Sequence, residues 1–170
     1  MDPLYVPFKI RTFSGQYVNV FDPDQKTLQI VDVAHALSMN ARFGGHSPVF
    51  ISVAEHSIWI CDYLASNGYS KQTCFDGLMH DCSEAYLIDM PKPIKLELPD
   101  YNKVEDVLMA ALSKRFKFRF PLTDDIKLAD KIALEWEWKY LVTTKKKRPS
   151  TMSQKKAKRE FLKRYKKYKP

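Results

Sequence analysis

A short segment between Gly77 and Lys95 constrains the fold more than any other part of the chain. It reads GLMHDCSEAYLIDMPKPIK and sets His80, Asp81 and Glu84 among apolar residues. In a helix Glu84 follows His80 by four positions and Asp81 by three, so the three side chains border one face. Charged groups in apolar surroundings are costly unless a partner compensates them. The segment therefore predicts a buried polar cluster, for which a metal ion is the natural counter-charge.

Apolar residues at helical spacing predict a mostly α-helical protein. Polar capping residues and Gly or Pro breaks separate the periodic segments, with Asp32 as the expected N-cap of the first helix and Ser70 as that of the third. The expected helices span about 32–40, 49–67, 70–90, 102–116, 125–142 and 153–168.

Residues before the first helix predict a small β-hairpin. Residues 8–13 alternate, Ser14-Gly15 can turn, and 17–21 are rich in β-formers. Residues 27–30 could add a short strand after the Asp-Pro-Asp turn. The expected fold is thus mostly α, with a hairpin in about 8–30 and a helical core in about 31–144.

The net charge of +8 belongs to the end of the chain. Residues 1–144 carry 15 Lys and Arg against 19 Asp and Glu, whereas 145–170 carry 13 against 1. We therefore expect one domain over 1–144, followed by a basic linker and an amphipathic helix. The apolar stripe of that helix predicts docking, either on its own body or on a neighbouring subunit. Its basic face favours a solvated surface over nucleic-acid binding, which stays an alternative.

Composition also limits the cellular setting. No run of eighteen apolar residues is present, and the first residues do not resemble a signal peptide, so we expect a soluble cytoplasmic protein without a membrane partner. The odd number of cysteines and the absence of a C-x-x-C pair predict reduced thiols. The three are Cys61, Cys74 and Cys82.

The loop Arg42-Phe43-Gly44-Gly45-His46-Ser47-Pro48 interrupts the helical pattern. It places a cation, an aromatic ring and an imidazole close together, and its glycines permit close approach of the backbone to a ligand. Such a loop could hold a phosphate and a stacked base. A plain turn between helices is the alternative, and composition alone does not decide between them.

Candidate metal ligands come from three expected helices. The set is mixed, with two imidazoles and two carboxylates: His56, His80, Asp81 and Asp130. Nitrogen and oxygen ligands of this kind suit Mn, Fe, Co or Zn better than Ca. His35, a lone histidine beside apolar neighbours, is expected to be structural.

These residues give the sequence a family resemblance. The segments AEHS at His56, LMHDCSEA at His80-Asp81 and LADK at Asp130 resemble the HD-domain metal-dependent phosphohydrolases, and the match extends from about Val31 to Tyr140. The continuation to PKPIK is similar to a nucleotide-hydrolysing branch that includes bacterial 5′-deoxynucleotidases and phage dATP triphosphohydrolases. The resemblance implies an HD-domain helical bundle, one catalytic metal held by the four ligands, and an oligomer.

The resemblance also implies roles for residues around the metal. Glu84 would orient or deprotonate the attacking water, and Asp89 would lie near the leaving group or sugar. Further matched positions bind substrate in that branch: Arg42 for phosphate, Phe43 for the base, and Lys95 and Lys127 for phosphate. His46 has no matched role, and phosphate contact and a structural turn are its two interpretations.

The expected activity is hydrolysis of a dNTP, dATP first, to a deoxynucleoside and tripolyphosphate. Dephosphorylation of a dNMP is the alternative, and a nucleic-acid-binding or assembly module with a degenerate core is a less favoured one. Gly45 stands where the adenine-selective members carry a bulky aliphatic residue, so strict exclusion of guanine is not expected. If the chain is encoded by a phage, its setting is the host cytoplasm.

Overall fold

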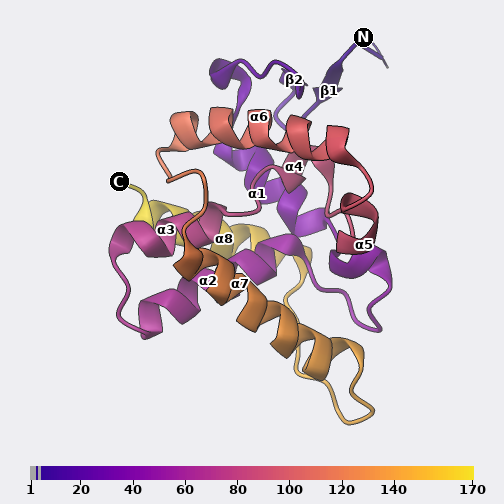
Figure 1. Cartoon of the computed structure of the whole chain (residues 1–170), viewed down its shortest axis with the longest axis vertical. Coiled ribbons are helices and arrows are strands. Elements are labelled where there is room, and N and C mark those ends of the chain that lie inside the picture. The colour runs from indigo at the N-terminus through magenta and orange to yellow at the C-terminus, as the bar shows by residue number, and fades with distance from the viewer. Residues whose placement is uncertain (1–2, 4) are drawn as a thin grey trace.

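The computed structural model describes Pro3 and residues 5–170 and confirms a mostly α-helical fold with a small N-terminal hairpin (Figure 1). The strands are β1 (Lys9–Arg11) and β2 (Tyr17–Asn19), and the helices are α1 (Ile30–Met39), α2 (Val53–Ser66), α3 (Lys71–Met79), α4 (Glu84–Leu87), α5 (Lys92–Lys95), α6 (Pro99–Phe116), α7 (Asp124–Glu137) and α8 (Gln154–Tyr168). Short 3-10 turns lie at Gln25–Thr27 and Arg42–Gly45, and a π-helical turn at Trp138–Val142 extends α7.

The hairpin is antiparallel, with Ile10 opposite Val18. Residues 27–30 do not form the additional strand that the sequence suggested, so that prediction is wrong. Gln25–Thr27 forms a 3-10 turn instead, because Asp24 accepts a hydrogen bond from the Lys26 backbone N–H, and α1 already begins at Ile30.

Asp32 does not cap α1, so that prediction is wrong too. The helix begins two residues earlier, after Gln29, and this places Asp32 in its first turn. There its carboxylate accepts hydrogen bonds from Thr12 Oγ1 at 2.9 Å, Ser14 N at 2.6 Å and Ser14 Oγ at 2.8 Å. Asp32 therefore fastens the hairpin turn to α1.

Helices α2 and α3 pack closely against each other. A Cβ atom at Gly77 would lie only 2.5 Å from Leu64 Cδ1 and 3.0 Å from Ile60 Cγ2, so this crossing favours glycine. The predicted cap of α3 is confirmed, because Ser70 Oγ accepts from Thr73 N at 3.1 Å. The helix expected to reach residue 90 instead ends at Met79, and His80 and Asp81 lie in the turn that leads to α4.

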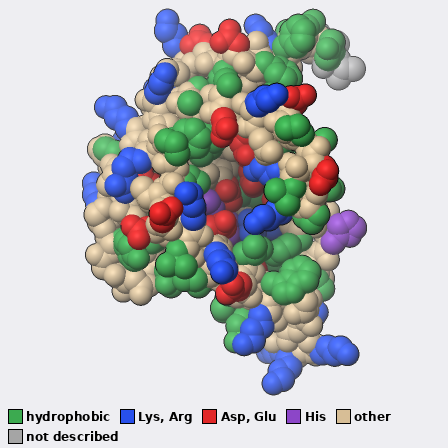
Figure 2. All heavy atoms as spheres, in the orientation of Figure 1, with side chains coloured by type: hydrophobic (Ala, Val, Ile, Leu, Met, Phe, Trp, Pro, Cys, Tyr) green, Lys and Arg blue, Asp and Glu red, His purple; other side chains and the backbone are tan. Residues whose placement is uncertain are grey.

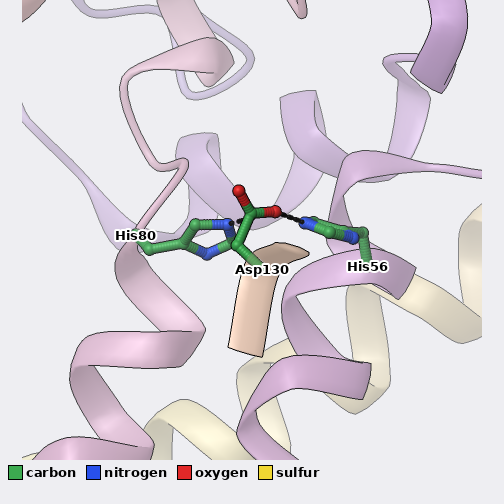
Figure 3. Close-up of side chains that lie close together, drawn as sticks. All are labelled: His56, His80 and Asp130. Carbon is green, nitrogen blue, oxygen red and sulfur yellow. Dashed lines mark hydrogen bonds and ion pairs between the residues drawn. The ribbon is translucent and has the colours of Figure 1, made fainter. Parts of the chain in front are cut away.

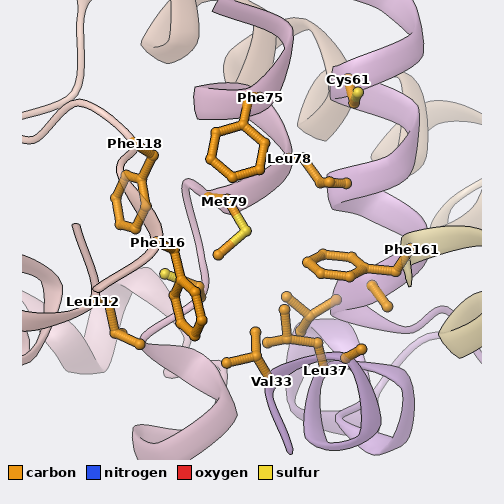
Figure 4. Packing of buried hydrophobic residues seen from close by; sticks show 14 of the residues in the cluster. Val33, Leu37, Cys61, Phe75, Leu78, Met79, Leu112, Phe116, Phe118 and Phe161 are labelled. Atoms are coloured by element: carbon orange, nitrogen blue, oxygen red, sulfur yellow. The ribbon is translucent and has the colours of Figure 1, made fainter. Parts of the chain in front are cut away.

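Helix α8 packs on α1, α2 and α3 of its own chain. Its apolar stripe is buried, and Phe161 lies among Val33, Leu37 and Leu78 in the core (Figure 4). On its outer side Arg164 pairs with Asp62 at 2.7 Å. Of the two docking alternatives, the structure therefore shows the chain's own body. Residues 154–168 belong to the same core as the preceding helices.

His35 has the expected structural role. Its ring stacks on Phe13 with 3.9 Å between centroids, and its Nδ1 lies 3.3 Å from Lys158 Nζ. Lys158 in turn sits 4.0 Å from the centre of the Phe13 ring. The three side chains join the hairpin, α1 and α8.

The remaining sequence predictions concern thiols and membranes. All three cysteines are buried and free, as predicted. Burial raises the pKa of the Cys61 thiol to about 12.

Within residues 3 and 5–170, none of the helices has the length and apolarity that a membrane span requires.

Candidate metal centre and adjoining cavity

Three elements bring the candidate ligands to one point. His56 comes from α2, His80 from the turn after α3, and Asp130 from α7. The ligand atoms of these three residues all lie within 4.8 Å of one another. Figure 3 shows the Asp130 carboxylate between the two imidazole rings. This convergence is a cluster able to hold a metal ion.

Asp81 completes the set that the sequence indicated. Its Oδ2 lies 2.9 Å from His80 Nε2 and 3.7 Å from His56 Nε2. Asp130 Oδ1 lies 3.0 Å from His56 Nε2 and 3.9 Å from His80 Nε2. Asp81 therefore lies beside the cluster of His56, His80 and Asp130, within 3.7 Å of both imidazole Nε2 atoms.

The outward nitrogen of each ring already has an acceptor. His56 Nδ1 lies 3.0 Å from Glu137 Oε1, and His80 Nδ1 lies 2.9 Å from the Gly77 carbonyl oxygen. A neutral imidazole carries a single N–H, so a donor at Nδ1 leaves a lone pair at Nε2. Each Nε2 nevertheless faces a carboxylate. A further proton on each Nε2, or one cation between the two Nε2 lone pairs and the carboxylates, would remove this repulsion.

His80 gives the clearest sign that a cation fits. Its Nε2 is buried and has no hydrogen-bond partner, because Asp81 Oδ2 lies 2.9 Å away without the angles of a hydrogen bond. Metal-binding histidines commonly donate their other N–H to a carboxylate or backbone carbonyl, as both rings do here. The donor set and its orientation therefore fit a metal ion.

Electrostatics separate the carboxylates into two groups. Burial alone would raise the pKa of Asp81, but His80, His56 and Arg42 outweigh it and hold that pKa well below the usual range. Glu84 shows the opposite balance, because burial raises its pKa well above the ordinary value and Asp81 adds to the rise. The lowered pKa keeps Asp81 ionised and able to bind a cation, whereas the raised pKa of Glu84 favours its protonated form.

A cavity of about 960 Å³ opens above the cluster. Figure 2 shows a hollow in this face with acidic side chains at its floor and basic ones around it. Most of the predicted site residues line it: Arg42, Phe43, His46, Asp81, Glu84, Asp89, Lys95 and Asp130. His56 and His80 are buried beneath them.

The glycine-containing loop forms one wall of the cavity. Arg42 is buried, and its Nε donates to Glu137 Oε2 at 2.9 Å. Phe43 has a left-handed backbone with φ 58°, and its N–H donates to Asp89 Oδ2 at 3.2 Å. Asp89 therefore holds the loop in place, whereas His46 is exposed at the edge.

The two predicted phosphate-binding lysines differ. Lys95 lines the cavity beside Lys92 and pairs with Glu105. Lys127 does not line it, because its exposed ammonium pairs with Asp124 one turn earlier on α7 at 3.1 Å. The resemblance implies phosphate binding by Lys127, but in the structure its side chain extends away from the cavity.

Glu137 and Trp138 belong to the site but are not among the residues predicted from sequence. Glu137 is buried and contacts both His56 and Arg42, and Trp138 lines the cavity with its ring 6.0 Å from that of Phe43. A seven-residue spacing from Asp130, which is two helical turns, could have indicated Glu137. For Trp138 the sequence carries no comparable signal.

Known proteins provide an independent comparison. The chain shares 35% identity over 128 residues with YfdR of Escherichia coli (strain K12), covering 75% of this chain and 69% of that protein. The chain belongs to the YfdR family. It also shares 34% identity over 128 residues with a protein of Rhodobacter capsulatus, covering 72% of this chain and 65% of that protein. Both relatives are described as uncharacterized, and no protein-family model matches the chain.

Proposed function

We propose that this chain is an HD-domain metal-dependent phosphohydrolase that converts a dNTP, dATP first, to a deoxynucleoside and tripolyphosphate. One observation carries the proposal. Two imidazoles and two carboxylates, supplied by three elements, converge at the floor of a cavity whose wall presents Arg42 and Phe43. Structural stability alone would not require such a set of potential ligands below an open cavity.

The residues that would hold the metal are His56, His80, Asp81 and Asp130. Mn, Co, Zn or Fe suits this mixed nitrogen and oxygen set. A bound divalent ion supplies polarisation of a phosphoryl oxygen and lowers the pKa of water toward neutrality.

Glu84 would handle the proton of the attacking water. It lies in the cavity, its Oε2 is buried without a hydrogen-bond partner, and its raised pKa moves it toward the range of an effective general base. The water oxygen bonds to the α-phosphorus, the bond to the 5′ oxygen breaks, and that oxygen leaves with a proton. Asp89 keeps the Arg42-Phe43 loop at the reacting group through its bond to the Phe43 N–H.

Charge around the cavity favours a triphosphate over a monophosphate. Lys127 lies outside the cavity, whereas Arg42, Lys92 and Lys95 line it. Three cations near the metal suit the charge of a triphosphate. Phe43, with Trp138 nearby, offers an aromatic surface for the base.

The test is a set of incubations of purified protein with Mn(II) or Co(II) and each dNTP or dNMP. Tripolyphosphate from dATP supports the proposal, and inorganic phosphate from a dNMP would support a 5′-nucleotidase instead. Asp81→Ala serves as the inactive control, with circular dichroism to show that its helices remain. If no nucleotide is hydrolysed and the protein binds DNA in a salt-sensitive manner, the basic residues 145–170 would define a binding module.

A further inference from the structure

Glu137 contacts both the cluster of candidate metal ligands and the wall of the cavity. Only 4% of the residue is exposed. Its Oε1 lies 3.0 Å from His56 Nδ1, and its Oε2 accepts from Arg42 Nε at 2.9 Å. One carboxylate therefore joins a candidate metal ligand to a candidate phosphate-binding arginine.

Each contact has a consequence for the partner. Acceptance at Nδ1 fixes the His56 tautomer whose Nε2 lone pair faces Asp81 and Asp130. On the other side, Arg42 uses Nε for Glu137, which leaves its terminal nitrogens for the cavity. Its Nη1 now lies 3.9 Å from Asp81 Oδ2. Without Glu137, the buried guanidinium would turn fully to Asp81 and compete with a metal ion for that carboxylate.

We propose that Glu137 is a positioning residue that couples metal binding to phosphate binding. The inference rests on the proposed function, because it assumes that a nucleotide phosphate binds beside the metal. Glu137 prepares both sites through one side chain, His56 as a neutral ligand and Arg42 as an oriented donor. Loss of its charge therefore weakens the binding of both the metal ion and the phosphate, although Glu137 would contact neither of them.

The variant that tests this role is Glu137→Gln. Glutamine keeps the size of the side chain but replaces one carboxylate oxygen with an NH2 donor. Because His56 and Arg42 face different oxygens of Glu137, one of them would then face a donor in place of an acceptor. Asp76→Asn is the matched control outside the site. Asp76 is 1% exposed and accepts hydrogen bonds from Arg119 and Gln72, so its variant also breaks a buried carboxylate network.

Two affinities are measured by calorimetry in a Glu84→Gln background, which prevents turnover. The first is for Co(II), and the second is for dATP at saturating Co(II). We expect Glu137→Gln to weaken Co(II) about 10–100-fold, the range known for partners of metal ligands, and dATP about 10-fold through loss of an oriented charge-assisted contact. Asp76→Asn should lower the unfolding temperature and leave both affinities unchanged.

An unchanged affinity for either ligand in Glu137→Gln would overturn the coupling. A parent protein that binds neither Co(II) nor dATP would instead overturn the proposed function. The tautomer is tested without any variant at Glu137, by imidazole nitrogen NMR of the Zn(II)-loaded wild-type protein. We expect the proton of His56 on Nδ1, and a proton on Nε2 would contradict the inference.

Discussion

Asp130 Oδ1 lies 3.0 Å from His56 Nε2, although the two residues are 74 positions apart in the chain. The contact joins α7 to α2 at the floor of the cavity. Because both ring nitrogens of His56 face carboxylates, this pair is completed by a proton or by a metal ion. The contact that packs α7 on α2 is therefore also part of the candidate metal-ligand cluster.

Asp130→Asn should abolish tight metal binding. The amide keeps the shape but removes a negative ligand, and we expect Co(II) affinity to fall by more than about 100-fold, beyond the range for partners of ligands. Co(II) absorption titration measures the loss. Asp125→Asn, an exposed substitution on the same helix, is the control. Equal affinity of the two variants would remove Asp130 from the ligand set.

Phe43→Ala should weaken the binding of ligands that carry a base and leave the binding of ligands without a base unchanged. Stacking of a base on an aromatic ring contributes about 1–3 kcal/mol, so dATP affinity should fall about 5–150-fold while tripolyphosphate affinity stays unchanged. Phe21→Ala, which removes an exposed ring on the hairpin side, is the matched control. Parallel loss of both ligands would show that Phe43 supports the loop and does not bind a base.

Stability should depend on pH through Glu137. Burial alone would raise its pKa, but His56 and Arg42 outweigh it and lower the pKa below 4.5. A lowered folded-state pKa means that the carboxylate stabilises the fold above its unfolded pKa, and that this contribution is lost as pH falls through the folded value.

The measurement compares metal-free wild type with Glu137→Gln by urea unfolding between about pH 6 and about pH 3. The gap in free energy of unfolding should be about 1–3 kcal/mol at the upper end and should shrink below about pH 4.5. Glu97→Gln, at an exposed position, should show no such gap. A gap that widens toward low pH would contradict the assignment.

Local sequence patterns predicted the elements well and their long-range contacts less well. Apolar spacing located the main helices, and Ser70 was correctly identified as a cap. The predictions for Asp32 and Lys127 differ from the structure, because a position on a helix does not determine which neighbour a polar side chain reaches. Glu137 was missed because its partners His56 and Arg42 lie 81 and 95 positions away. Only the packing of α7 on the preceding elements brings these residues together.

Phe161→Ala should show that α8 is part of the core. Phe161 is fully buried among residues of α1 and α3, and such truncations cost about 3–5 kcal/mol in free energy of unfolding. Lys163→Ala, at an exposed position on the same helix, should change stability by less than about 0.5 kcal/mol. Chemical unfolding at two protein concentrations provides the decisive comparison. Because the stripe of α8 is covered by its own chain, the stability lost in Phe161→Ala relative to wild type should be the same at both concentrations. A loss that changes with concentration would mean that a second copy packs on this stripe.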